Sequence, residues 1–130
     1  MTSTLTGPVA GARSALHELH RALSTPPDAG ALGMWRWSVR HCMAAVRDLL
    51  VGESDHPDDG WLAPRRSATL RERNSLLQRL SALALQVVES PEVEGVRAEL
   101  LRLHGDIARH FQRLRDLAWD EVEYEVGGSE

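Results

Sequence analysis

The sequence predicts a single all-α domain, built as an up-down-up-down bundle of four helices. Leu, Ala, Arg and Glu, which all favour helix, dominate its 130 residues. Strand signals are scarce, because Ile107, Phe111 and Tyr124 are the only Ile, Phe and Tyr and no stretch alternates cleanly between apolar and polar residues. Apolar residues recur at helical spacing in four segments, separated by breaks that contain Pro or Gly.

Length and composition indicate one domain over residues 1–130, with a net charge of −4. A nucleic-acid partner is not expected, because phosphate binding requires a basic surface. No apolar run approaches the ~20 residues of a membrane span. The segment Met1–Gly7 lacks the basic and apolar regions of a signal peptide. We therefore expect a cytoplasmic protein that binds neither nucleic acid nor membrane.

The first helix is expected over Pro8–Leu23 and the second over Met34–Gly52, on either side of a segment with two prolines and two glycines. The apolar stripe of the first helix consists of Val9, Ala12, Leu16, Leu19 and Leu23. That of the second consists of Trp35, Val39, Cys42, Val46 and Leu49. One further turn of the second helix brings in Glu53, so this carboxylate is a candidate for the interior of the bundle.

The third helix is expected over Ser67–Glu89, where Thr69 and Glu72 have the spacing of a capping box. Its stripe consists of Leu70, Leu77, Leu80, Ala84 and Val88, and Leu76, Leu83 and Val87 widen it. So broad an apolar surface predicts a well-buried helix.

The fourth helix is expected over Pro91–Glu125, with Ser90 as its N-cap and Pro91 at its first position. Its stripe consists of Val96, Leu100, Leu103, Ile107, Phe111, Leu114 and Ala118, joined by His110. Gly127 and Gly128 then mark a stop. Gly105 weakens the middle of this helix by roughly 1 kcal/mol relative to Ala, so the sequence allows a kink or a break there.

Three side chains are candidates for a metal site inside the bundle. His110 lies within the stripe of the fourth helix, His20 lies at the edge of the first stripe, and Glu53 ends the second helix. Imidazole and carboxylate groups that point inward from several helices suit iron, manganese or zinc. The structural alternative makes His110 a hydrogen-bonded core residue, His20 a half-exposed helix-edge residue and Glu53 a solvated carboxylate.

The sequence resembles the hemerythrin-like (HHE cation-binding) domains, especially the short actinobacterial members. The matching segments are Leu16-His17-Glu18-Leu19-His20-Arg21-Ala22-Leu23, Leu70-Arg71-Glu72-Arg73-Asn74, Ile107-Ala108-Arg109-His110-Phe111-Gln112-Arg113-Leu114-Arg115-Asp116-Leu117 and Gly127-Gly128. The resemblance implies a four-helix bundle that holds a non-haem di-iron centre. Its implied ligands are a His on the first helix, His-x-x-x-Glu on the second, Glu-His on the third and His-x-x-x-Glu on the fourth.

Against that ligand set, this sequence keeps His20 or His17, Glu53 and His110. The other positions differ. Leu49 stands four residues before Glu53, Arg73-Asn74 replaces the Glu-His pair, and Leu114 stands four residues after His110. A neutral amide is a weak donor for iron, so the site is degenerate in this interpretation.

The favoured function is therefore a non-catalytic hemerythrin-like bundle that acts as an interaction or oligomerisation module without a cofactor. The partner is another protein or a second copy of the chain. One alternative is a metal-binding protein that uses non-haem iron in oxygen, iron or redox sensing. Another is a small-ligand pocket, lined by Trp35, Cys42, His110 and Phe111.

Residues outside the core support the favoured function. Trp37 lies off the stripe of its helix and Trp61 lies in a loop, and exposed tryptophans are frequent at binding hot spots. The alternative for Trp61 is that the loop folds back and buries it. The acidic tail Asp120–Glu125 is either a solvated helix end or a docking segment for an Arg-rich surface.

Cys42, the only cysteine, is expected to be a small buried apolar residue rather than a reactive thiol.

Overall fold

The computed structural model describes residues 8–52 and 63–128, and the side chains of 11–52 and 67–117. Its elements are α1 (Pro8–Ser24), the 3₁₀ helix η2 (Ala29–Ala31), α2 (Leu32–Val51), α3 (Ala63–Glu89) and α4 (Val93–Gly128). The described residues contain no strand. The predicted all-α fold with four helices is therefore confirmed.

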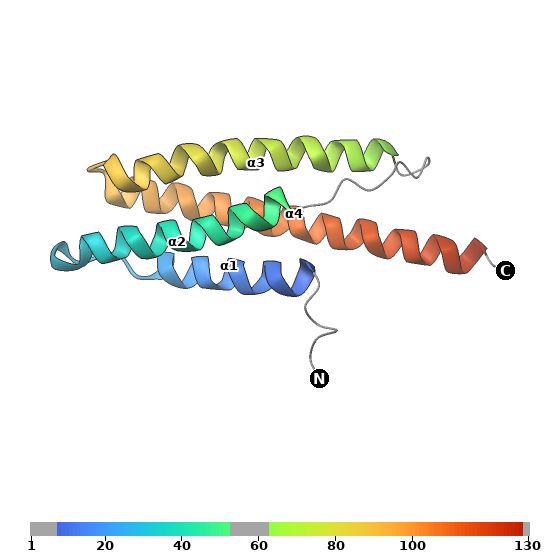
Figure 1. Cartoon of the computed structure of the whole chain (residues 1–130), viewed down its shortest axis with the longest axis horizontal. Coiled ribbons are helices and arrows are strands. Elements are labelled where there is room, and N and C mark those ends of the chain that lie inside the picture. Colours follow the sequence, from blue (N-terminus) through green and yellow to red (C-terminus); the bar gives the residue numbers. More distant parts are fainter. Residues whose placement is uncertain (1–7, 53–62, 129–130) are drawn as a thin grey trace.

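The four long helices form an antiparallel bundle. Each packs against its neighbour in the sequence, and α1 also packs against α4, which closes the bundle. The connections from α1 to α2 and from α3 to α4 lie at one end, and α4 ends far from them (Figure 1). This is the expected up-down-up-down order.

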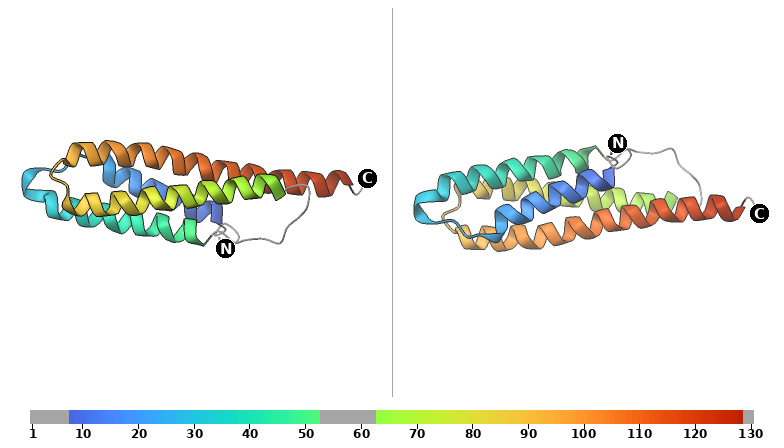
Figure 2. Two further views of the ribbon diagram at one scale, coloured as in Figure 1. Left: turned by 90° about the horizontal axis from the view of Figure 1, so that it is seen from above. Right: turned by 90° about the horizontal axis from the view of Figure 1, so that it is seen from below.

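The helices differ strongly in length. α1 has 17 residues and α4 has 36, which at about 1.5 Å per residue makes α4 roughly twice as long. Both views in Figure 2 show α4 continuing beyond the ends of α1 and α2. The last turns of α4 therefore lie outside the four-helix part of the molecule.

The start of α3 differs from the prediction. The helix begins at Ala63 rather than Ser67, and Pro64 occupies its first turn, where a missing N–H costs nothing. Thr69 and Glu72 consequently lie well inside the helix and do not form a capping box. That prediction was wrong because the spacing alone does not show whether a helix begins there.

Ser90 supplies a hydrogen bond just before α4. The helix itself begins at Val93 rather than at the predicted Pro91. The backbone N–H of Glu92 donates to Oγ of Ser90 over 3.0 Å, so this side chain satisfies a donor just before the helix. α4 then runs through Gly105 without a break and ends at Gly128 rather than Glu125. The break that Gly105 allowed is therefore absent.

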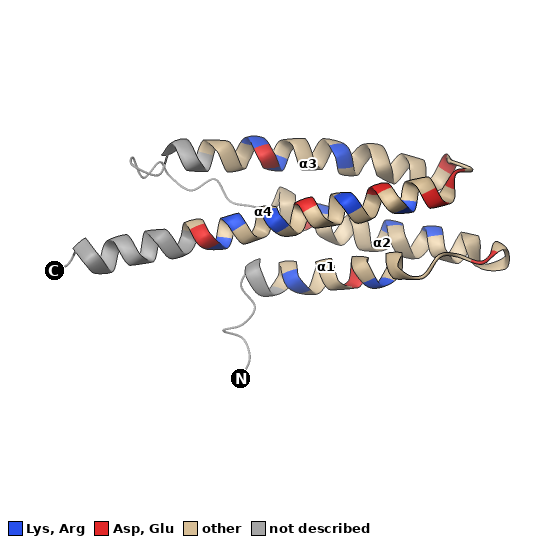
Figure 3. Cartoon of the chain, turned by 180° about the vertical axis from the view of Figure 1, so that it is seen from behind, with Lys and Arg blue, Asp and Glu red and all other residues tan. Residues whose placement is uncertain are grey.

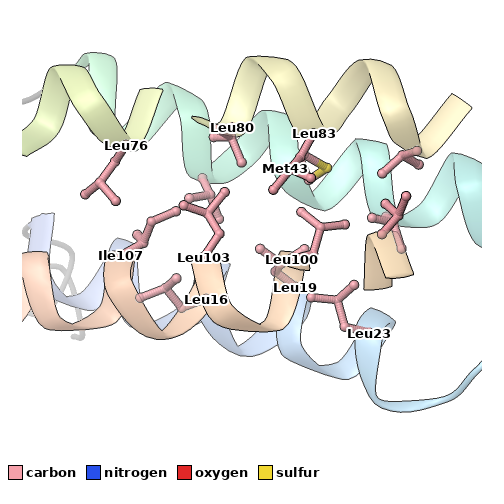
Figure 4. Close-up of a cluster of buried hydrophobic side chains, with 14 of the residues drawn as sticks. Leu16, Leu19, Leu23, Met43, Leu76, Leu80, Leu83, Leu100, Leu103 and Ile107 are labelled. Atoms are coloured by element: carbon pink, nitrogen blue, oxygen red, sulfur yellow. The ribbon is translucent and has the colours of Figure 1, made fainter. Parts of the chain in front are cut away.

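The core lies along the middle of the bundle, where buried Leu, Ile, Val and Met side chains of all four helices meet (Figure 4). The predicted stripes of α1 and α4 are confirmed over the described residues, apart from Phe111 and Leu114, which are half-buried. In α2, Met43 and Leu50 are buried where Cys42 and Leu49 were expected. In α3 the buried residues are Leu76, Leu80, Leu83 and Val87, so the widening residues form the true centre of that stripe.

No described helix is both long enough and apolar enough to span a membrane.

Candidate functional site

The predicted ligand His110 is a buried residue of α4 that is bonded to Glu72 of α3. Its side chain is 0% exposed, and its Nδ1 lies 2.6 Å from Oε1 of Glu72. Arg113, three residues further along α4, donates from Nε to the same oxygen over 3.1 Å and from Nη2 to Oε2. We call these three residues the Glu72 cluster, and they link α3 to α4.

Two donors control the ionisation of Glu72. Burial alone would raise the pKa of its carboxyl group, but hydrogen bonds from Arg113 and His110, together with their positive charge, lower this pKa below its ordinary value. Both carboxylate oxygens thus accept hydrogen bonds from the chain itself. A metal ion at Glu72 would have to displace Arg113, so the cluster has the character of a structural ion pair.

The role of Glu72 is not among the sequence predictions, although the sequence contains a signal for it. Glu72 stands four residues before Leu76, the first buried leucine of α3, and residues at that spacing share a helix face. A carboxylate in line with an apolar stripe requires a partner, because burying an unpaired charge is costly. The stripe of α4 supplies this partner in His110.

The second predicted ligand, His20, is exposed on α1 and lies beside His104 of α4. The two ring centroids are 5.2 Å apart, with 50° between the ring planes. Nδ1 of His20 lies 3.3 Å from Oγ of Ser24, and Nε2 of His104 lies 2.9 Å from the carbonyl oxygen of Leu16. Burial lowers the pKa of the His104 imidazole, the bond to Leu16 opposes this shift, and the charge of His20 adds to it. His104 is therefore neutral at neutral pH.

The structure does not bring His20 and His110 to one point. His104 and His110 are six residues apart, which is about 9 Å along the axis of α4, and His20 is at the level of His104. Among the side chains that the structure describes, those of 11–52 and 67–117, no group of three or more His, Cys, Asp or Glu residues is arranged to hold a metal ion. Glu53 lies outside the described residues, so the predicted set of His20, Glu53 and His110 stays a prediction.

Asn74, which stands at an implied ligand position, makes no hydrogen bond with the described histidines and bonds to its neighbour Arg73 instead. Its side chain is exposed, and Oδ1 accepts hydrogen bonds from the neighbouring Arg73. Asn74 therefore joins neither the Glu72 cluster nor the pair formed by His20 and His104.

Large apolar side chains are exposed near the start of α2 and near the end of α3, which lie at the same end of the bundle (Figure 1). We call four of them the apolar patch: Met34 (70% exposed), Trp37 (63%), Leu85 (59%) and Val88 (44%). Arg36 ties the two helices together here, because its Nη2 donates to the carbonyl oxygen of Ser90 over 3.0 Å. The prediction that Trp37 is exposed is therefore confirmed.

Trp37 makes a stacking contact on the surface of α2. Its ring stacks on that of His41, with centroids 5.1 Å apart and 6° between the planes. Trp35, by contrast, is buried in the core, as expected. Trp61 and the side chain of Trp119 lie outside the described residues.

Charged residues of both signs alternate along the described part of α4, as the colours of its ribbon in Figure 3 show. Several form pairs three residues apart, such as Arg102 with Glu99 and Arg109 with Asp106. Exposed pairs of this kind contribute little to stability, with a median of about 0–1 kcal/mol. The side chains of the acidic tail Asp120–Glu125 lie outside the described residues, so its predicted docking role stays a prediction.

Cys42 is half-buried where α1 and α2 meet, rather than fully buried in the core. Its thiol lies 3.7 Å from the carbonyl oxygen of Glu18. Burial raises the pKa of the Cys42 thiol, and the nearby charge of Glu18 raises it further. The thiol is thus protonated at neutral pH, which disfavours a nucleophilic role.

A shallow groove of about 150 Å³ lies between α1 and α4, lined by Ala12, Arg13, Leu16, Ala108, Phe111, Gln112 and Arg115. Its volume is below the ~300–1,000 Å³ of typical small-molecule sites. Of the four residues predicted to line a ligand pocket, only Phe111 contributes to it. This groove is not the pocket expected from the sequence.

Comparison of the chain with protein-family models, with curated proteins and with solved structures finds no match.

Proposed function

We propose that this chain is a non-catalytic helical bundle that acts as an interaction module, and that it associates with a second copy of itself through the apolar patch. The exposure of Trp37 together with Met34, Leu85 and Val88 carries the proposal. Large apolar side chains that stay exposed on a folded domain are candidates for a contact surface, and Trp is enriched at binding hot spots.

The charges beside the patch favour a second copy as the partner. Arg40 is three residues from Trp37 on α2, and Glu89 is four residues from Leu85 on α3; both are exposed. Residues at these spacings are neighbours on a helix surface. In a two-fold dimer that places α2 of one copy against α3 of the other, opposite charges would face each other around an apolar centre.

The interior gives less support to the alternative, a hemerythrin-like protein that binds non-haem iron. Glu72 is the described carboxylate bonded to His110, and Arg113 and His110 occupy both of its oxygens. Metal analysis of protein purified without chelators tests this alternative. About one or two equivalents of iron per chain, lost in Glu53→Gln, would favour iron binding over a module without a cofactor.

The proposed dimer is tested by light scattering after size-exclusion chromatography over a concentration series. We expect the wild-type chain to have twice the 14.4 kDa monomer mass at the highest concentrations. Trp37→Ser combined with Leu85→Ser should give a monomer with an unchanged circular dichroism spectrum, because both side chains are exposed. Val51→Ser is the matched control, since Val51 is 52% exposed at the other end of α2.

Two outcomes would overturn this proposal. One is a wild-type chain that stays monomeric across the series, to about 100 μM, where an association with a micromolar Kd would be nearly complete. The other is a dimer whose mass does not change in the double variant.

A further inference from the structure

His20 and His104 form a pair on the surface between α1 and α4 that neither the interaction function nor the predicted iron set uses as a unit. His20 is exposed and His104 is half-buried, so the pair is open to solvent. A ring nitrogen can bind a ligand only if it keeps a lone pair, and the hydrogen bonds around each ring determine which nitrogen does so.

The hydrogen bonds of Ser24 fix the tautomer of His20. Oγ of Ser24 lies 2.7 Å from the carbonyl oxygen of His20, and it donates its single proton to that oxygen. Oγ must then accept the second contact, which comes from Nδ1 of the His20 ring at 3.3 Å. The proton of a neutral His20 is therefore on Nδ1, and Nε2 keeps its lone pair.

The tautomer of His104 is fixed in a similar way. Its Nε2 lies 2.9 Å from the carbonyl oxygen of Leu16, a group that can only accept. Nε2 therefore carries the proton, and Nδ1 keeps its lone pair. Nδ1 of His104 and Nε2 of His20 have no hydrogen-bond partner among the residues that the structure describes.

This arrangement is typical of metal-binding histidines, which donate the N–H of one ring nitrogen to an oxygen acceptor while the other nitrogen binds the ion. The separation of the rings also fits. With Zn–N distances of about 2.0–2.1 Å and tetrahedral geometry, two imidazoles on one ion have centroids about 5 Å apart. The observed distance between the centroids is 5.2 Å.

We propose that His20 and His104 form a surface site for a zinc ion, which clamps α1 to α4. Two imidazole nitrogens bind the ion and water completes its coordination, because the described residues supply no third His, Cys, Asp or Glu ligand. The chemistry differs from that of the predicted iron set. It shares only His20 with that set and contains no carboxylate, and a donor set of imidazoles suits zinc better than a bridged iron pair.

The site is tested by titrating zinc chloride into the full, tag-free chain in a chelator-free buffer, followed by isothermal calorimetry. We expect one zinc ion per chain, with at least about tenfold weaker binding in His20→Gln and in His104→Gln. His41→Gln is the matched control, because His41 is an exposed histidine that stacks on Trp37 of α2. Glu53→Gln separates this site from the predicted iron set, and it should bind zinc like wild type.

Thermal unfolding provides a readout that does not depend on the heat of binding. Zinc should raise the Tm of the wild type and of His41→Gln, because an ion held only by the folded chain stabilises it. It should leave the Tm of His104→Gln unchanged, while this variant without metal unfolds cooperatively. Absence of zinc binding at 100 μM by the wild type, or binding that survives in His104→Gln, would overturn the site. So would loss of binding in Glu53→Gln.

Discussion

At the scale of single residues, Glu72 and His110 show how a polar pair is kept inside an apolar bundle. His110 has no exposed surface, and its Nδ1 donates to Glu72. Glu72 also accepts from Arg113, whose side chain is half exposed, so the cluster connects the core to solvent. A buried imidazole with a charged partner avoids the cost of an unsatisfied polar group.

Glu72→Gln should destabilise the chain by about 1–3 kcal/mol at pH 7, because hydrogen bonds to charged groups are worth this much. The folded state lowers the pKa of Glu72, so its contribution is present above the unfolded pKa and is lost as pH falls through the folded pKa. Urea unfolding at pH 7 and near pH 3 measures this. The difference between wild type and variant should shrink at the lower pH.

Glu99→Gln provides the control for the Glu72 experiment. Glu99 pairs with Arg102 on the exposed surface of α4, and such pairs contribute about 0–1 kcal/mol. A Glu72→Gln variant no less stable than Glu99→Gln at pH 7 would contradict a stabilising role for the cluster.

At the scale of the elements, Arg97 caps the C-terminal end of α1. Its Nε donates to the carbonyl oxygen of Leu23 over 2.6 Å, and its Nη2 donates to that of Ser24 over 3.2 Å. The last carbonyls of a helix have no partner within the helix, and a cation is favourable there. Arg97 belongs to α4, so it both caps α1 and fixes its position against α4.

Arg97→Ala should lower the free energy of unfolding by about 1–3 kcal/mol, because two charge-assisted hydrogen bonds are lost. Arg97→Lys should recover only part of this, since a single ammonium group does not reproduce the fork of the guanidinium group. Denaturant unfolding measures both. Arg102→Ala, which removes an exposed pair, should change stability by less than about 1 kcal/mol. Equal losses for Arg97→Ala and Arg102→Ala would refute the capping role.

The element boundaries show what sequence patterns could and could not predict. The helical spacing of apolar residues predicted all four long helices, because each of them buries one apolar face in the core. It misplaced the centre of two apolar stripes by one residue, as in α2, where Met43 and Leu50 are buried instead of Cys42 and Leu49. Adjacent apolar residues fit the period almost equally well, and the packing of α1 and α3 against α2 decides between them.

The candidate sites were less predictable than the fold. The burial of His110 followed from its place on a stripe, whereas its pairing with Glu72 depends on the alignment of α3 with α4. The pairing of His20 with His104 depends in the same way on how α1 lies along α4. A single sequence indicates the buried face of each helix to within about one residue, but it does not show how far one helix is shifted along another.

At the scale of the whole molecule, the three connections between the long helices are very unequal. Only residues 90–92 separate α3 from α4, whereas residues 25–31 separate α1 from α2 and residues 52–62 separate α2 from α3. The entropy lost on closing a loop grows with its length, and local contacts form fastest. We therefore expect α3 and α4 to pair in the folding transition state, before α1 docks.

Stopped-flow folding of three core variants tests this order. Leu80→Ala on α3 and Leu103→Ala on α4 should slow folding, whereas Leu19→Ala on α1 should mainly speed unfolding. Each substitution should cost about 2–5 kcal/mol, enough to assign the effect to one rate. A Leu19→Ala variant that slows folding as much as Leu103→Ala would reverse the order. The short turn after Glu89 would thus make α3 and α4 the template on which the rest of the chain assembles.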